Sequence, residues 1–330
     1  MDRIRTHVTP FVLIPFLLLA MGGSQELPAV TVPGDATYPE CVAVDPESGR
    51  FFVGSAAHGA IYQASVDDDA MTLLVDSDAA TIPTAYGLDV DDHGRLWVVG
   101  GPTGRIAVYD VETGQLVREL ATPQAEATFL NDVAIAPDGY AYMTDSTRPT
   151  IFRAAAGPDG VGDVEAWLDL ASTPIEYESS DDMLASINLN GIEAVEDALY
   201  TVQMNTGQVF RVDLDDGGVS EVYLGREDLT FGDGLAIAGR TMFVVRIAAE
   251  EIVTIELAES GRAGEVVERW THDELDFPAC AAVSDDRLLV VSTQFDRRAD
   301  GDPELPFRVL NLRAHDLSDR SEPEPTGCGC

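Results

Sequence analysis

Four oxygen-bearing side chains stand at the same position of a short pattern that recurs along this 330-residue sequence. The six copies of that position, which we call the column, hold Glu40, Tyr86, Asn131, Asn190, Asp233 and Ala279. Two carboxylates and two amide carbonyls directed at one point would bind a hard divalent cation. We therefore expect one divalent cation, calcium first, with magnesium, manganese or zinc as alternatives.

Turn formation is the competing interpretation of these residues. Asn and Asp at the start of a strand often accept hydrogen bonds that close a turn, and Asn190–Gly191 and Asp233–Gly234 are turn-like dipeptides. Any one of them alone indicates only a turn. Four such residues in register around a ring favour a metal site.

Six repeated segments carry the column, each with two apolar strands joined by an Asp- or Gly-bearing turn. The segments begin at Tyr38, Ala85, Phe129, Leu189, Phe231 and Phe277. The column position recurs after 46, 45, 59, 43 and 46 residues, and a third and usually a fourth apolar strand follow each pair. This spacing is typical of a four-stranded propeller blade. The sequence predicts an all-β, six-bladed β-propeller of four-stranded blades.

The two ends of the propeller are expected to meet in the last blade, which is one strand short. Residues 28–32 form a strand without a blade of its own, and pairing with the last blade would cover an exposed edge. Cys41 and Cys280 would then occupy equivalent positions in neighbouring blades. They could form a disulfide that stabilises the closure by about 2–4 kcal/mol, or remain two buried thiols.

The sequence is strongly acidic, with a formal net charge of −38, and all 20 of its basic residues are Arg. Such a charge repels nucleic acid and anionic lipid, so we exclude both as partners. A small molecule is the expected partner of a monomer. Because the acidic residues are spread along the chain, the charge does not identify that molecule.

The first 24 residues follow the order of a secretory signal, with Arg3 and Arg5 before an apolar run and small residues after it. The prediction is a signal peptide at 1–24 and a secreted or extracytoplasmic protein without membrane association after cleavage; an uncleaved anchor is the alternative. A single propeller domain is expected at 25–314. The polar, acidic residues 315–330 are expected to form a disordered tail.

The order Glu, Asn-Asp, Asn-Gly and Asp-Gly at the segment starts resembles the family of senescence marker protein (regucalcin), gluconolactonase and luciferin-regenerating enzyme. The resemblance covers residues 28–314 and implies a single cation bound by Glu40, Asn190 and Asp233. Paraoxonases, a more distant resemblance, share the architecture and a disulfide that joins the chain ends, which favours the disulfide interpretation of the two cysteines.

The family resemblance implies a metal-dependent hydrolase of a lactone or ester. The cation would stabilise the oxyanion formed when water attacks the carbonyl. Asp233, or hydroxide on the cation, would take the proton, and Asn131 would contact water or substrate. No Gly-x-Ser-x-Gly sequence occurs, so a covalent serine mechanism is disfavoured. The alternative function is a non-catalytic binding or scaffold propeller with a structural calcium ion.

Loops that open on the face of the column would supply the wall of a pocket. The candidate wall residues are His58, Tyr86, Asp145, Arg148, Gln203, Arg246 and His272. Residues 171–188 are too long for an ordinary connection and are expected on the same face as a candidate lid. This insertion and Ala279 in the column depart from the family pattern.

Overall fold

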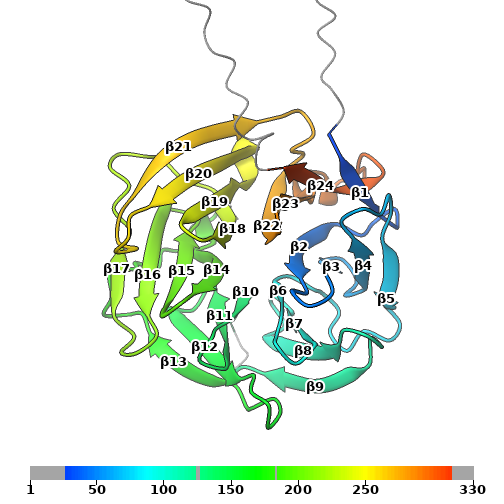
Figure 1. Ribbon diagram of the computed structural model, residues 1–330, viewed down its shortest axis with the longest axis horizontal. Coiled ribbons are helices and arrows are strands. Elements are labelled where there is room, and N and C mark those ends of the chain that lie inside the picture. The colour runs from blue at the N-terminus through cyan, green and yellow to red at the C-terminus, as the bar shows by residue number, and fades with distance from the viewer. Residues whose placement is uncertain (1–26, 124–126, 183, 314–330) are drawn as a thin grey trace, which may run out of the picture.

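The computed structural model describes residues 27–313, apart from 124–126 and 183. Within this part of the chain the strands form six sheets of four antiparallel strands each. The sheets are arranged as blades around a central axis (Figure 1). The predicted all-β, six-bladed propeller is therefore confirmed. The predicted signal peptide at 1–24 and the predicted tail at 315–330 lie outside the described residues.

The strands of each blade follow one another from the axis outward, and we number the blades in chain order. Blade 1 contains β2 (Pro39–Val44), β3 (Arg50–Ser55), β4 (Ile61–Ser65) and β5 (Thr72–Val75). Blade 2 contains β6 (Leu88–Val90), β7 (Arg95–Val99), β8 (Arg105–Asp110) and β9 (Leu116–Ala121). Blade 3 contains β10 (Leu130–Ile135), β11 (Tyr140–Asp145), β12 (Thr150–Ala155) and β13 (Glu165–Asp169).

The second half of the ring repeats this order. Blade 4 contains β14 (Leu189–Val195), β15 (Ala198–Gln203), β16 (Gln208–Asp213) and β17 (Val219–Glu221). Blade 5 contains β18 (Gly232–Ala238), β19 (Thr241–Arg246), β20 (Glu251–Leu257) and β21 (Gly264–Thr271). Blade 6 contains β22 (Pro278–Ser284), β23 (Arg287–Ser292), β24 (Phe307–Arg313) and β1 (Ala29–Val32).

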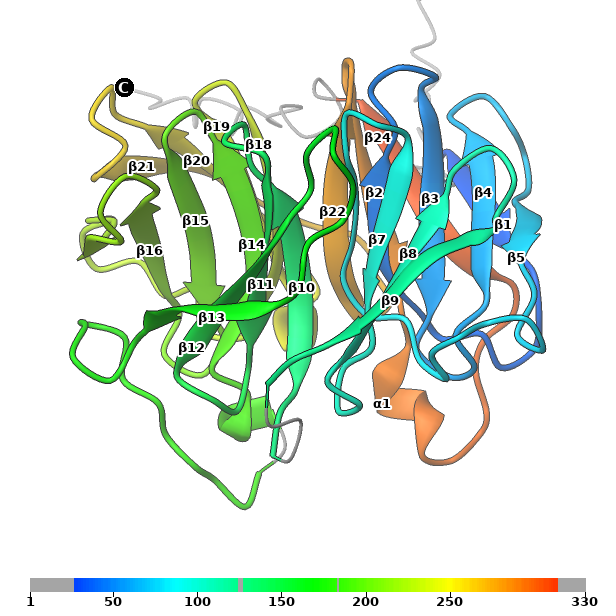
Figure 2. The same ribbon diagram turned by 90° about the horizontal axis from the view of Figure 1, so that it is seen from below.

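Helical structure in the described residues is confined to short connections. These are two 3₁₀ turns, η1 (Leu184–Ser186) and η2 (Ile247–Ala249), and one short α-helix, α1 (Phe295–Arg298). Helix α1 extends from one face of the ring when the propeller is seen from the side (Figure 2). No helix in residues 27–313 has the length and apolar character needed to span a membrane.

The ring closes through the two ends of the described chain, as the sequence predicts. Strand β1 pairs antiparallel with β24, with Ala29 opposite Leu310 and Val32 opposite Phe307. The N-terminal strand is therefore the outermost strand of blade 6. This pairing covers the edge of β24, which would otherwise present unpaired backbone groups to other chains.

A disulfide between Cys41 and Cys280 joins the inner strands of blades 1 and 6 at the same closure, with a Cα–Cα distance of 4.8 Å. Of the two interpretations that the sequence left open, the structure shows the disulfide. The bond links residues 239 positions apart. A cross-link over so long a segment restricts the unfolded chain strongly, which is the main source of its stabilising effect in the chain-entropy model.

The hydrophobic core lies between the blades, because each sheet is covered on both faces by its neighbours. All five residues of β7 are buried, including Trp97. At the outer edge, β21 instead alternates partly buried and exposed residues, as expected for a strand with one face in water. The inner strands β2, β6, β10, β14, β18 and β22 lie against one another in this order and enclose the axis.

We predict that replacing both disulfide cysteines, Cys41→Ser with Cys280→Ser, lowers the free energy of unfolding by about 2–5 kcal/mol. Denaturant unfolding of the wild type and the double variant measures the loss. The control is reductant, which should destabilise the wild type to the same extent and leave the double variant unchanged. Equal stability of all four samples would show that the cross-link does not hold the ring closed.

Candidate functional site

A bulge repeated in five of the six inner strands aims the column side chains. On β2, Pro39 is opposite Ser55 and Val42 is opposite Val53, so the inner strand has one extra residue. The same shift follows the first residue of β10, β14, β18 and β22. Each bulge contains a column residue and the residue after it. Bulges redirect side chains, and here they turn the column toward the axis.

Left-handed backbone accompanies three of these bulges. Tyr38, Phe231 and Phe277, each two residues before a column position, have φ angles of 42°, 67° and 52°. Bulky residues rarely adopt positive φ, and such backbone gathers at functional sites. The chain therefore enters these three inner strands through the same unusual turn, which fixes where the column residue begins.

Glycine after the column lets neighbouring inner strands approach closely. A Cβ atom on Gly191 would lie 2.7 Å from the backbone oxygen of Asp233, and one on Gly234 would lie 2.7 Å from the backbone oxygen of Ala279. Both glycines are strand residues with a neighbouring backbone beside them. The Asn-Gly and Asp-Gly dipeptides thus reflect close strand packing rather than hairpin turns.

The column residues share one cavity of about 840 Å³ at the mouth of the channel. Five of the six column residues line it: Glu40, Tyr86, Asn131, Asn190 and Asp233. Ala279 is fully buried and is not part of the lining. Turn η1, within the 171–188 insertion, and helix α1 contribute wall residues. The insertion therefore lies at the column face, as expected.

Hydrogen bonds fix the two column amides. The Asn131 Nδ2 donates to Ser146 Oγ at 3.0 Å, and that hydroxyl donates to the backbone oxygen of Leu189 at 2.6 Å. The Asn190 Nδ2 is 3.3 Å from Met204 Sδ. For Asn131, one N–H of the amide is thus held by protein, and the carbonyl oxygen and the second N–H are left for a ligand.

The two column carboxyls are buried, and burial is the largest cause of the raised pKa of each. Burial raises the pKa of Glu40 well above its usual range, and the charges of Asp233 and Asp132 raise it further. Burial also raises the pKa of Asp233 to about 8, although a hydrogen bond from Asn190 opposes this rise. No hydrogen bond to the Glu40 carboxylate is found among the described residues, although only 5% of the residue is exposed.

This donor set fits a hard divalent cation. The Glu40 carboxylate borders the cavity without a protein donor in the described chain, where a positive charge or a proton would offset the cost of its burial. Carboxylate and amide oxygens are the ligands that calcium-like ions prefer. In the described part of the chain, no three His, Cys, Asp or Glu side chains gather around one point. A cation site would therefore depend on the Asn190 amide oxygen as well as on the two carboxylates, with Asn131 beside it.

Of the seven wall residues predicted from the sequence, the structure places only Tyr86 in the lining of this cavity. The Tyr86 ring packs edge-on against Phe129, with 4.9 Å between centroids. Burial raises the pKa of Tyr86, and a hydrogen bond with Arg298 opposes this rise. Tyr86 therefore connects the column with α1.

Two other predicted wall residues, Asp145 and Arg148, organise their own loop instead. The Asp145 carboxylate accepts backbone N–H groups from Phe129 and Arg148 and pairs with the Arg148 guanidinium. Arg148 also stacks over the Phe152 ring at 4.6 Å. Both side chains are held by these contacts and are absent from the cavity lining.

The remaining four predicted wall residues also lie outside the lining. The Gln203 amide donates to Glu176, Arg246 pairs with Glu251, and His272 stacks on Trp270. His58 lies in the connection after β3, where burial lowers its pKa. Gln203, Arg246 and His272 are thus held by local contacts, whereas the buried His58 Nδ1 has no hydrogen-bond partner in the described residues.

Sequence reasoning missed the apolar wall. Its members are Phe129, Leu184, Ile187, Met204, Ile247, Phe277, Phe295 and Ala299. Part of this wall could have been predicted, because an aromatic residue recurs two positions before the column. These residues are Tyr38, Phe129, Phe231 and Phe277, and two of them, Phe129 and Phe277, line the cavity. Phe295 and Arg298 come from the connection between β23 and β24, which no repeat describes.

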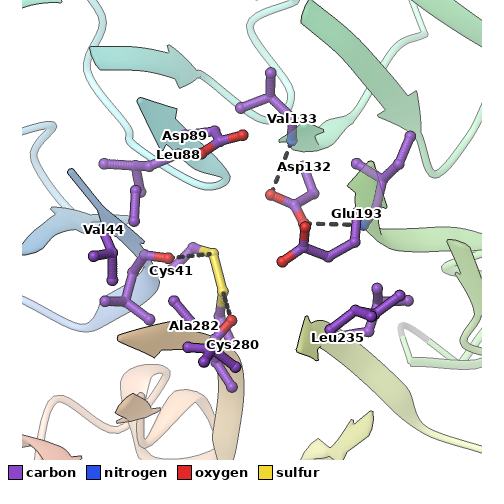
Figure 3. A pocket seen from close by; sticks show the side chains of 16 residues that line it. Cys41, Val44, Leu88, Asp89, Asp132, Val133, Glu193, Leu235, Cys280 and Ala282 are labelled. Atoms are coloured by element: carbon purple, nitrogen blue, oxygen red, sulfur yellow. Dashed lines mark hydrogen bonds between the residues drawn. A yellow bond between two sulfur atoms is a disulfide. The ribbon is translucent and has the colours of Figure 1, made fainter. Parts of the chain in front are cut away.

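A second, smaller cavity of about 230 Å³ lies further along the channel, beside the inner-strand residues that come after the column positions. Figure 3 shows the Cys41–Cys280 disulfide, Asp89, Asp132 and Glu193 around it. Burial raises the pKa of Asp89 and of Asp132 to about 7.

Both aspartates of this second cavity serve the ring as hydrogen-bond acceptors between blades. Asp89 accepts the N–H groups of Val90 and Ile135, and Asp132 accepts those of Val133 and Ile192. Each carboxylate therefore joins two consecutive blades, which is a structural role.

Comparison with known proteins places this fold among established propellers. No protein-family model matches the chain, and no curated protein is significantly similar to it in sequence. Among solved structures, the major allergen of Malassezia sympodialis is 14% identical, with 92% of this chain and 100% of that chain covered and a TM-score of 0.65. A calcium-binding regucalcin from Agrobacterium tumefaciens is 16% identical, with 86% and 97% covered and a TM-score of 0.59.

A gluconolactonase from Xanthomonas campestris is similar in the same way, at 16% identity, with 84% and 87% covered and a TM-score of 0.56. These likenesses show a shared fold. The chain is a six-bladed propeller of the architecture found in regucalcin and gluconolactonase structures. The resemblance expected from the sequence is thus confirmed for the fold.

We predict that stability falls as the pH rises from about 4 to 7, in part because of Asp89. Its folded pKa of about 7 exceeds the unfolded value of about 3.9, so the folded state holds a proton that the unfolded state has lost. The Asp89→Asn variant should show a flatter pH dependence in denaturant unfolding. Asp110→Asn is the control, because hydrogen bonds from Thr113 lower the pKa of Asp110. An unchanged slope in Asp89→Asn would contradict the assignment.

Proposed function

We propose that this propeller is a metal-dependent hydrolase of a lactone or ester. The observation that supports the proposal is the convergence of two buried carboxylates and two amides in one apolar-walled cavity. Glu40, Asn190 and Asp233 would hold a divalent cation, with calcium favoured and Asn131 beside it. When bound, the cation supplies Lewis-acid stabilisation of the negative charge that develops on the carbonyl oxygen.

Asp233 is proposed as the general base. Its carboxylate lies in the cavity beside Asn190, whose side chain lowers the pKa of Asp233 by hydrogen bonding. Water attacks the carbonyl carbon while its proton passes to Asp233, and the proton then goes to the leaving alkoxide as the carbon–oxygen bond breaks. A lactone would open to a hydroxy acid. Positive charge bound beside Asp233 would lower its pKa from about 8, which would leave the base ionised near neutral pH.

Asn131 is proposed to orient the water or the substrate carbonyl. Ser146 holds its Nδ2, so the amide cannot rotate without losing a hydrogen bond. A preorganised group of this kind contributes most when charge develops in the transition state. Its carbonyl oxygen can accept a hydrogen bond from the attacking water.

Export is a further part of the proposal. Disulfides persist in oxidising compartments such as the periplasm and the extracellular space, and the Cys41–Cys280 disulfide suits such a location. Small-molecule lactones and esters would reach the cavity from the solvent at the face that carries α1. The non-catalytic alternative, a binding propeller with a structural calcium ion, predicts cation binding without turnover.

For a lactone that the wild type hydrolyses with calcium, Asp233→Asn should abolish turnover because it removes the base and one negative charge. Asn131→Ala should lower kcat by up to about 10²–10³-fold while calcium still binds, because the three proposed ligands remain. Steady-state kinetics and calorimetry measure the two effects. Asp215→Asn, in an exposed turn, is the matched control. Turnover that survives both substitutions and exhaustive chelation would refute the mechanism.

Calcium affinity should fall as the pH falls below about 8. The ion competes with the protons that burial favours on Glu40 and Asp233, so affinity should drop by up to about tenfold per pH unit for each proton displaced. Calorimetric titration with calcium between acidic and mildly alkaline pH measures this. Glu40→Gln should bind calcium more weakly and with a shallower pH dependence. A pH-independent affinity would place the ion elsewhere.

A further inference from the structure

The cavity has a polar floor, formed by the column residues, and a largely apolar wall. Resting on the hydrolase function proposed above, we infer that the substrate carries an apolar alkyl or aryl group that lies against Phe129, Ile187 and Phe295. It is therefore not the hydroxyl-rich ring of a sugar lactone. The inference concerns the substrate class and depends on residues outside the column.

The apolar wall surrounds the column on several sides. Phe129 comes from blade 3, Ile187 follows η1 in the insertion, and Phe295 begins α1. All three side chains are partly buried, so they have surface left to contact a ligand. The cavity of about 840 Å³ lies toward the upper end of the usual range for small-molecule sites, which leaves room for a substituent beyond the reacting ring.

Most polar groups in this wall have close protein partners; the exception is the Asp296 carboxylate at the rim, which is 45% exposed and lies 4.0 Å from Arg297. The Ser146 hydroxyl donates to Leu189, and the Thr147 hydroxyl donates to Ala127. The Arg298 guanidinium donates to the backbone oxygen of Ala56, and it stacks over the Tyr38 and Phe295 rings. The wall therefore offers few free donors or acceptors to a ligand, and what it presents is aromatic and aliphatic surface.

This wall discriminates between two kinds of lactone. A buried methylene group favours binding by about fourfold, because apolar surface leaves water. A hydroxyl group that is buried without a hydrogen bond disfavours binding by about tenfold. A sugar lactone would bring several hydroxyl groups against the rings, whereas an alkyl or aryl lactone would bring none. The geometry thus selects against a polyhydroxylated ring even when the carbonyl fits the floor.

The test is a substrate series assayed with the full chain and calcium. It comprises unsubstituted δ-valerolactone, δ-lactones with alkyl chains of increasing length, and glucono-δ-lactone. We expect kcat/KM to rise by about fourfold per methylene until the cavity is full. Glucono-δ-lactone should be about a hundredfold poorer than the best alkyl lactone.

Wall variants assign the effect to the proposed residues. Phe295→Ala and Ile187→Asn should each lower kcat/KM for the longest alkyl lactone by about tenfold and change the unsubstituted lactone by less than about twofold. Tyr223→Ala is the matched aromatic control, because Tyr223 is 70% exposed and lies outside the cavity lining. Equal losses on all lactones would overturn the assignment of these residues to specificity.

A binding measurement separates this inference from the hydrolase proposal. An alkyl-substituted δ-lactam, which resists hydrolysis, is titrated by calorimetry into the wild type and Phe295→Ala, with calcium and with chelator. Phe295-dependent binding without turnover of any lactone would refute the hydrolase and support the apolar ligand class. Glucono-δ-lactone as the best substrate would support the hydrolase and overturn the apolar class. Absence of lactam binding would also overturn it.

Discussion

Close approach of the inner strands around the axis is the constraint on which the site depends. Gly87, Gly191 and Gly234 occupy the position after the column where a side chain would meet the next strand. The two cysteines at this position in blades 1 and 6 bond to each other. The inner strands lie close together at this position. The column residues directly before it, such as Asn190 and Asp233, lie in the same bulges and are therefore brought together. The site therefore follows from how the ring closes.

The buried carboxylates of the channel are of two kinds: one accepts hydrogen bonds from the backbone, and the other has no donor in the described chain. The Asp132 carboxylate accepts N–H groups from Val133 and Ile192, so its burial is offset by hydrogen bonds that join blades. The Glu40 carboxylate faces the charges of Asp233 and Asp132, and nothing in the described chain donates to it. Hydrogen-bonded acids hold a structure together, whereas unpartnered ones call for a ligand or a proton. This contrast separates Asp132, whose carboxylate has a structural role, from Glu40, whose carboxylate is proposed to bind the ion.

Much of the fold and the column could be predicted because both repeat. The repeat length predicts six sheets, as observed. Alignment of the repeats predicts which residues face the axis, and Glu40, Asn131, Asn190 and Asp233 do line one cavity. Most of the wall could not be predicted in this way, because it comes from connections that occur once, such as η1 and α1. Polar residues in loops, such as Asp145, gave a misleading signal: they satisfy nearby backbone groups first.

An acidic floor beneath an apolar wall has a chemical consequence. Apolar side chains exclude water and lower the local dielectric, so charge interactions at the column are stronger than they would be in solvent. The same exclusion raises the pKa of Asp233, which would leave it protonated unless positive charge lies beside it. Wall and cation are therefore interdependent in the proposed site, since the wall that favours an apolar substrate also makes the base rely on the ion. Because the wall is built on connections outside the blade repeat, its specificity can change while the ring that positions the column stays the same.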